Sequence, residues 1–176
     1  MPLMNAKHSR LVILDFQARL MPAIHDGPRL VANAGRLVAA AKLLDVPIVM
    51  TEQNPAGLGS TVSELAEAAP AIAKMSFDAC AAPAFIEAIA GDDDLVLCGC
   101  EAHVCFGQTA LSLLEHKRRV LVVQDAVGAR VPESKDVSLR RLARNGAEVV
   151  TTEMVVFEWL RTAEHPQFRA ALKLVK

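Results

Sequence analysis

The sequence predicts a three-layer α/β/α fold built on a parallel sheet, and two patterns carry that prediction. Short runs of Val, Ile and Leu recur along the chain, and they are continuously apolar, which is typical of strands covered on both faces. Longer segments with apolar residues at steps of three and four separate these runs, as in amphipathic helices. This alternation favours a parallel sheet with right-handed crossovers and helices on both faces.

The predicted elements follow one another from the first apolar run to the C-terminus. We expect strands at residues 11–14, 46–50, 95–98, 120–123 and 147–151, and a further short apolar run that ends at Lys74. We expect helices at residues 30–44, after Pro83, and at 103–116, 134–145 (closed by Gly146), 152–160 and 166–175 (begun by Pro166). Residues 52–60 are rich in Asn, Pro and Gly, so we expect an irregular loop there that forms a pocket wall.

The length and composition predict one domain over residues 1–176 that acts on a small-molecule substrate. A chain of 176 residues lies within the usual single-domain range. The formal net charge of -1, with acids and bases intermixed, gives no electrostatic footprint for nucleic acid or for an anionic membrane. Hydrophobic residues make up 52% of the chain, which indicates buried strands, a buried subunit contact or both, and we expect a homo-oligomer.

The N-terminal residues predict a cytoplasmic protein. They lack the basic start and long apolar run of a signal peptide, and no apolar stretch reaches membrane-spanning length. In that compartment we expect all four cysteines to be free thiols. Cys98, Cys100 and Cys105 have no second Cys pair of the kind that structural zinc sites favour, and we expect no metal and no cofactor.

Three residues that could carry chemistry stand where predicted strands end or the next helix begins. Asp15 follows the first strand, Lys74 ends the short apolar run, and Cys105 begins the helix after residues 95–98. Each has an ordinary alternative, as a capping Asp, a surface Lys or a small buried Cys. At a helix start, however, the dipole would lower the thiol pKa, and free backbone N–H groups could bind an oxyanion. The ordered set therefore favours a nucleophilic site.

His103 offers a different partner for the thiol. Two residues apart on a helix, the side chains of His103 and Cys105 diverge by roughly 200° around the axis. We therefore expect His103 to line the pocket and an acid from another strand end to serve as the base.

Four motifs, in order and over nearly the whole chain, resemble those of the isochorismatase-like cysteine hydrolases. They lie at residues 11–17, 74–77, 99–105 with 108–110, and 125–127. Residues 51–59 and 101–105 are most similar to the subgroup called isochorismatase domain-containing proteins, whose substrates are poorly defined. The resemblance implies a six-stranded parallel sheet in the order 3-2-1-4-5-6, with an Asp-Lys-Cys triad at its carboxyl edge.

The resemblance also implies a role for each matched residue. Asp15 would take the thiol proton of Cys105, and Lys74 would hold the thiolate and orient Asp15. A non-proline cis peptide at Cys100–Glu101 would aim the backbone N–H groups of Glu101 and Cys105 into an oxyanion hole. The expected substrate contacts are Phe16, Gln17, Glu52, Phe77 and His103.

Two departures from the family pattern bear on the substrate. Residues 51–54 stand where nicotinamidases carry an Asp-x-His metal motif, which disfavours metal-dependent nicotinamide hydrolysis. True isochorismatases cleave a vinyl ether without a cysteine, so Cys105 favours covalent amide or ester chemistry. The sequence thus predicts a hydrolase that cleaves a small amide, other C–N or ester substrate through a thioester at Cys105.

Two alternatives to this hydrolase remain open. The chain could be a catalytically silent oligomeric scaffold that uses the pocket only for ligand capture. It could also carry thiol redox chemistry, with Cys98 or Cys100 resolving an oxidised Cys105.

Overall fold

One six-stranded parallel sheet organises the computed structural model, which describes residues 3–176. The strand order is β3-β2-β1-β4-β5-β6, and every neighbouring pair is parallel. This arrangement confirms both the predicted α/β class and the strand order that the resemblance implied. Residues 1 and 2 of the expected domain lie outside the described part of the chain. The strands are β1 Ser9–Leu14, β2 Ile48–Gln53, β3 Ala71–Lys74, β4 Asp94–Cys100, β5 Val120–Gly128 and β6 Glu148–Val150.

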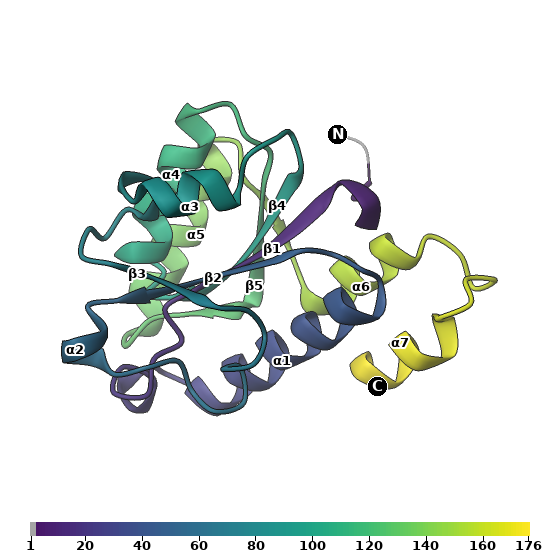
Figure 1. The fold of residues 1–176 in the computed structure, drawn as a ribbon, viewed down its shortest axis with the longest axis horizontal. Helices are drawn as coiled ribbons and strands as arrows, with labels where there is room; N and C mark the ends of the chain where they lie inside the picture. Colours follow the sequence, from purple (N-terminus) through teal and green to yellow (C-terminus); the bar gives the residue numbers. More distant parts are fainter. Residues whose placement is uncertain (1–2) are drawn as a thin grey trace.

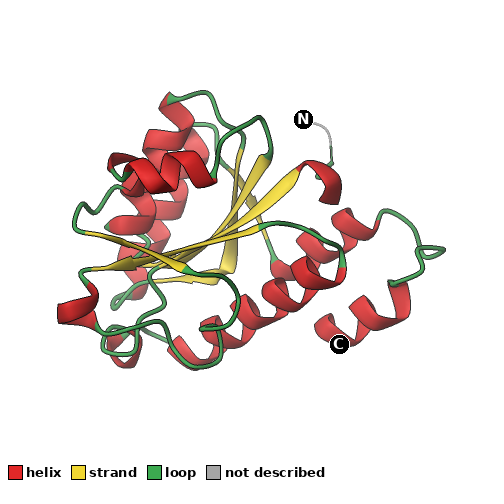
Figure 2. Ribbon diagram, in the orientation of Figure 1, coloured by secondary structure: helices red, strands yellow, loops and turns green. Residues whose placement is uncertain are grey.

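Helices cover both faces of the sheet, with α3, α4 and α5 on one side and α1, α6 and α7 on the other (Figure 1; Figure 2). Their bounds are α1 Gly27–Leu43, α2 Pro55–Leu58, α3 Pro83–Ala88, α4 Cys105–Glu115, α5 Pro132–Arg144, α6 Thr152–Leu160 and α7 Phe168–Val175. Short 3-10 turns span Ala6–His8, Met21–Ala23 and Ala79–Ala81. Within residues 3–176, no helix has the length and apolar character needed to cross a bilayer.

The side chains of β1, β2, β4 and β5 alternate between two hydrophobic clusters. In β1, Leu11 and Ile13 pack toward α1 and α6, whereas Val12 and Leu14 pack toward α3 and α4. All four are fully buried, which explains why the sequence shows a continuous apolar run instead of alternating polar and apolar residues. The same alternation in β2 decides which of its last residues can face α4.

Most predicted elements agree with the structure to within a few residues. Strand β5 continues to Gly128, five residues beyond its predicted end, and two other segments also differ. Residues 52–60 are more regular than expected, because β2 continues to Gln53 and a short helix begins at Pro55, a residue preorganised for a first helical position. Helix α7 begins at Phe168 and not at Pro166, because the backbone N–H of Phe168 bonds the His165 carbonyl in a turn that precedes the helix. Gly146 follows the end of α5 with a φ of 102°, as a helix-closing glycine should.

One residue of β4 and one residue of β5 position neighbouring elements. Gly99 in β4 has a φ of 145°, and a Cβ at this position would overlap the Leu14 carbonyl oxygen of β1. Asp125 of β5, part of a motif shared with the resembled family, accepts hydrogen bonds from the backbone N and Oγ1 of Thr152 at 2.8 and 3.0 Å. Asp125 therefore fixes the start of α6, while Gly99 lets the turn toward α4 approach β1.

We predict that Gly99→Ala lowers the free energy of unfolding by more than about 3 kcal/mol, because it adds both backbone strain and a clash with β1. Gly35→Ala in α1 is the matched control. Its new methyl group meets nothing within 4 Å, and alanine should stabilise the helix by about 0.5–1 kcal/mol. Urea denaturation measures both changes, and equal stabilities for the two variants would contradict the close approach at Gly99.

Candidate active site

Four polar or reactive side chains meet where β1, β2 and β3 end and α4 begins. They are Asp15, Gln53, Lys74 and Cys105, which are 0%, 7%, 5% and 6% exposed. Figure 1 shows the carboxyl ends of β1, β2 and β3 at the left of the view, beside α2. The structure thus brings together three residues chosen from the sequence and adds Gln53.

Asp15 is held at the first position after β1 with both carboxylate oxygens occupied. Its φ of 56° lies in the left-handed region, which Asp tolerates better than most residues and which interrupts the side-chain alternation of the strand. Oδ1 accepts a hydrogen bond from Thr51 Oγ1 at 2.6 Å, and Oδ2 accepts one from Lys74 Nζ at 2.8 Å. The carboxylate therefore has a fixed orientation in a site that solvent barely reaches.

Lys74 is a buried ammonium that links three parts of the site. Besides Asp15, its Nζ donates to Gln53 Oε1 at 2.9 Å and lies 3.4 Å from the carbonyl oxygens of Ser76 and Phe77. A buried ion needs such hydrogen-bond acceptors, because its removal from water costs several kcal/mol of free energy. The last residue of β3 is therefore an internal cation instead of a surface lysine.

Gln53 is the site residue that the sequence analysis missed. Its side-chain oxygen contacts both Lys74 and Cys105, whereas the preceding Glu52 was the residue expected to meet substrate. Strand alternation carries the missing signal: Val49 faces α3 and α4, so Gln53, four residues later, faces them too, and Glu52 faces away.

Cys105 begins α4, as predicted, but its pKa moves in the opposite direction from the one expected. Burial, followed by the Asp15 carboxylate, raises the pKa of the Cys105 thiol to about 12, although the Lys74 ammonium lowers it. The expected lowering by the helix start is wrong, because desolvation of the thiolate outweighs the nearby positive charges. At neutral pH the thiol is therefore protonated and needs a base.

The turn between β4 and α4 contains the expected cis peptide bond, between Cys100 and Glu101. Within residues 3–176, no hydrogen bond uses the backbone N–H of Glu101 or of Cys105. Cys105 occupies the first position of α4, where the backbone N–H has no intrahelical acceptor. Both N–H groups are therefore available to a developing negative charge.

Three of the expected substrate contacts pack or form hydrogen bonds within the fold in this structure. Phe16 is 1% exposed and belongs to the core on the α1 side. Gln17 is buried and donates to the carbonyl oxygens of Gln53 and Gly59 at 3.0 and 2.6 Å. Glu52 Oε1 accepts bonds from the backbone N and Oγ1 of Thr61, which ties the segment after α2 to the sheet.

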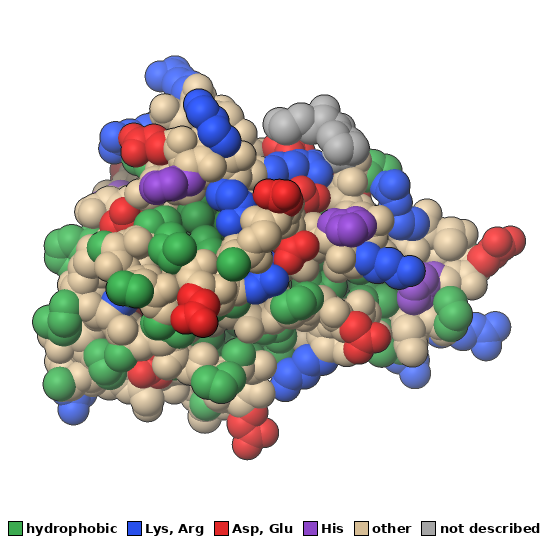
Figure 3. All heavy atoms as spheres, turned by 45° about the horizontal axis from the view of Figure 1, so that its top comes forward, with side chains coloured by type: hydrophobic (Ala, Val, Ile, Leu, Met, Phe, Trp, Pro, Cys, Tyr) green, Lys and Arg blue, Asp and Glu red, His purple; other side chains and the backbone are tan. Residues whose placement is uncertain are grey.

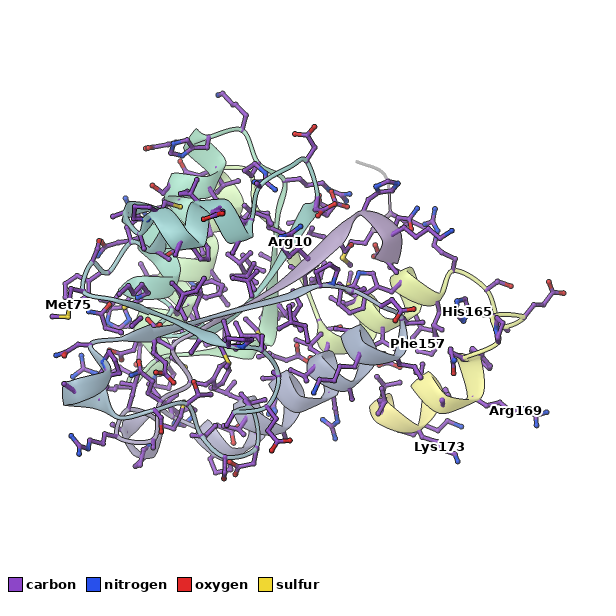
Figure 4. All side chains as sticks on the ribbon, viewed as in Figure 1. Arg10, Met75, Phe157, His165, Arg169 and Lys173 are labelled. Atoms are coloured by element: carbon purple, nitrogen blue, oxygen red, sulfur yellow. The ribbon has the colours of Figure 1, made fainter. Side chains whose placement is uncertain are left out.

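Phe77 and His103, the other two expected contacts, lie at the surface on segments that adjoin the site. Phe77 follows β3 and its side chain is exposed, while His103 is exposed in the turn before α4. Met75 lies at the left extreme of Figure 4 and points away from the sheet. These segments border the solvent side of the buried polar cluster.

The remaining cysteines are free thiols with raised pKa values. Burial raises the pKa of Cys100 to about 12 and also raises that of Cys98, and both lie in β4. The Cys100 Sγ packs 3.9 Å from Met21 Sδ. Across residues 3–176, the structure has no group of three or more His, Cys, Asp or Glu side chains that could hold a metal ion.

We predict that Lys74→Met lowers the free energy of unfolding by about 3–5 kcal/mol, because it leaves the buried Asp15 carboxylate without its cation. The double variant Asp15→Asn with Lys74→Met should be less destabilised than Lys74→Met, since neither charge remains. The exposed Asp26–Arg29 pair is the control, and Arg29→Met should cost less than about 1 kcal/mol. Urea denaturation at pH 7 measures all three variants, and equal losses for Lys74→Met and Arg29→Met would contradict the burial argument.

Comparisons with known proteins identify a family and relatives that match most of this chain. The model of the isochorismatase domain family matches residues 9–154. Isochorismatase domain-containing protein 2A of Mus musculus is 38% identical over 172 residues, which are 96% of this chain and 82% of that protein.

Three solved structures share the fold over almost the entire chain. A structure of MAR1 ribonuclease from Caenorhabditis elegans has a TM-score of 0.94 and 32% identity, covering 99% of this chain and 92% of that chain. YcaC from Escherichia coli, described as an octameric hydrolase of unknown specificity, has a TM-score of 0.91 and 25% identity, with 99% and 89% covered. YcaC from Pseudomonas aeruginosa, with hexane-2,5-diol and covalent acrylamide, has a TM-score of 0.90 and 26% identity, with 98% and 91% covered. The chain belongs to the isochorismatase domain family.

Proposed function

We propose that the protein is a cysteine hydrolase that cleaves a small amide, other C–N or ester substrate through a thioester at Cys105. The observation that carries the proposal is the buried ion pair of Asp15 and Lys74 beside a thiol at a helix start. A surface lysine or a capping aspartate would not require two charges to be buried together without solvent. Membership of a hydrolase family supports the same conclusion.

The proposed first half-reaction begins with proton transfer from Cys105 to Asp15. Because the resting thiol is protonated, the carboxylate removes the proton as the sulfur attacks the acyl carbon, and the carbonyl π electrons move to oxygen. The Lys74 ammonium stabilises the negative charge on sulfur. The backbone N–H groups of Glu101 and Cys105 stabilise the oxyanion, and loss of one such donor typically costs about 2.7–4 kcal/mol.

The second half-reaction restores the enzyme. Collapse of the tetrahedral intermediate breaks the bond to the leaving group, which takes the proton from Asp15 and departs as an amine or alcohol. Water then loses a proton to Asp15 and attacks the thioester. The acid is released, and the proton on Asp15 returns to the sulfur of Cys105. No oxidant, metal or cofactor enters this sequence of steps.

The relatives inform the choice of substrate only in part. Covalent acrylamide in YcaC from Pseudomonas aeruginosa indicates a reactive nucleophile in that protein, because acrylamide is an electrophile. The ribonuclease name of the Caenorhabditis elegans structure would suggest RNA cleavage instead. A net charge of -1 gives this chain no general attraction for a polyanion, so we propose a small molecule and include RNA as a comparison substrate.

We further propose that residues 1–176 form one hydrolase domain that assembles as a homo-oligomer in the cytoplasm. Large apolar side chains are exposed around the carboxyl edge of the sheet, among them Met75, Phe77 and Val131 at 71%, 51% and 50%. Figure 3 shows apolar side chains gathered at the left of that view, with acidic and basic groups mixed among them. The octameric state of Escherichia coli YcaC supports self-association, and the free cysteines fit a reducing compartment.

We predict that Cys105→Ala abolishes turnover of the best substrate found in a panel of amides, carbamoyl compounds, esters and an RNA oligonucleotide, with a loss of more than about a thousandfold. Cys80→Ala, which removes a half-buried thiol on another segment, should retain turnover. Intact mass after acid quenching should show an acyl adduct on the wild type and none on Cys105→Ala. Unchanged turnover by Cys105→Ala would refute the thioester route, and a wild type that binds but cleaves nothing in the panel would favour the scaffold.

We predict that Asp15→Asn separates turnover from thiol reactivity. Turnover should fall by about 10²–10⁴-fold, because the general base is lost. Alkylation of Cys105 by iodoacetamide at pH 8 should instead become faster, because the Asp15 carboxylate raises the pKa of the thiol in the wild type. Asp26→Asn, at an exposed position before α1, is the control and should change neither rate. A parallel fall of both rates in Asp15→Asn would contradict the proposed role of the carboxylate.

A further inference from the structure

The amide oxygen of Gln53 contacts both the cation and the nucleophile of the proposed site. Gln53 Oε1 accepts a hydrogen bond from Lys74 Nζ at 2.9 Å and lies 3.8 Å from Cys105 Sγ, within hydrogen-bond range for a thiol. One neutral acceptor therefore contacts both groups, and it does so at a position that is 7% exposed.

The orientation of this amide is fixed from its other end. Gln53 Nε2 donates to the Met75 carbonyl oxygen at 2.7 Å, which directs the NH₂ group away from the site. Gln17 holds the backbone of the same residue, because Gln17 Oε1 accepts from the Gln53 N–H at 2.8 Å and Gln17 Nε2 donates to the Gln53 carbonyl. Rotating the Gln53 side-chain amide by 180° would place NH₂ against the Lys74 ammonium and lose the bond to Met75. The oxygen is therefore held toward Lys74 and Cys105.

We propose that Gln53 is a positioning residue of the Cys105 hydrolase site, a neutral acceptor that holds the Lys74 ammonium close to the Cys105 sulfur. This inference rests on the proposed nucleophilic role of Cys105. It assigns to the end of β2 a part in the chemistry that Asp15, Lys74 and Cys105 do not supply by themselves.

The contacts of Lys74 explain why a positioning residue is needed. Besides Asp15 and Gln53, Nζ lies beside the Cys105 sulfur and 3.4 Å from the carbonyl oxygens of Ser76 and Phe77, on the segment that leaves β3. If the Gln53 oxygen were withdrawn, the ammonium would turn toward those carbonyls, and its stabilisation of the thiolate would weaken.

The neutrality of Gln53 matters as much as its position. The Asp15 carboxylate already raises the pKa of the neighbouring thiol. A second carboxylate at position 53 would still accept from Lys74, but its negative charge would repel the thiolate in a site with little solvent screening. An amide supplies the acceptor without that repulsion.

The test is Gln53→Glu, which keeps the shape and the acceptor for Lys74, replaces the donor to the Met75 carbonyl by an oxygen and adds one negative charge. The measurement is the rate of Cys105 alkylation by iodoacetamide from pH 6 to pH 10, assigned to Cys105 by peptide mass. We expect the rate at pH 8 to fall at least tenfold and the whole profile to move to higher pH, since about one pKa unit changes the thiolate fraction tenfold. A side chain with only a structural role would leave the pH profile unmoved, and an unmoved profile overturns the proposal.

A second variant covers the case in which the glutamate does not fold. Gln53→Asn keeps the amide but shortens the side chain by one methylene, so the oxygen withdraws from both Lys74 and Cys105. We expect at least threefold slower alkylation at pH 8, and, with the best substrate of the panel, a lower kcat with KM changed by less than threefold. Wild-type alkylation in the folded Asn variant also overturns the proposal.

Gln108→Glu is the matched control for charge, because Gln108 is exposed on α4 three residues after Cys105. The same substitution there should leave the alkylation rate within twofold of the wild type, and an equal slowing would show a general charge effect that refutes a special role for Gln53. The alkylation readout needs no substrate. If Cys105→Ala retained turnover, the hydrolase proposal would fail by itself, whereas the inference about Gln53 fails only on the alkylation rates.

Discussion

The buried ion pair of Asp15 and Lys74 is the interaction on which the carboxyl edge of this protein depends. Two charges with almost no solvent contact are 2.8 Å apart, and each has a further polar partner: Thr51 for the carboxylate and Gln53 for the ammonium. Such a pair adds little folding stability compared with well-packed apolar residues, and removal of one member strongly destabilises the protein. Its presence at a strand edge is thus better explained by chemistry than by stability.

Burial also decides how the thiol can react. The helix start and the nearby ammonium favour a thiolate. Desolvation and the Asp15 carboxylate favour the protonated thiol, and these two effects are larger. In such a site the resting cysteine is a thiol and not a thiolate, so it reacts slowly with unrelated electrophiles. In the proposed reaction, the carboxylate beside the thiol forms the nucleophile, and the negative charge on sulfur appears only when substrate is attacked.

The scaffold explains how residues from separate parts of the chain reach one point. Parallel pairing aligns the ends of β1, β2 and β3, so the residue after β1 and the last residues of β2 and β3 become neighbours. Gly99 allows the turn after β4 to approach β1 closely, which brings the start of α4 to the same edge. Binding of a ligand at the carboxyl edge is a general property of open parallel sheets, but the polar network here is specific to these side chains.

The α/β class and most element positions can be predicted from the sequence, and the resemblance to a known family adds the strand order and the set of Asp15, Lys74 and Cys105. These features depend on local periodicity and on residue types at strand ends, which can be recognised in the sequence. Three features emerge from the folded arrangement: Gln53 and not Glu52 faces α4, Gln17 and Glu52 hold backbone segments, and the Cys105 pKa rises instead of falling. The physical reason is that orientation and desolvation are set by neighbours distant in sequence, which local patterns do not encode.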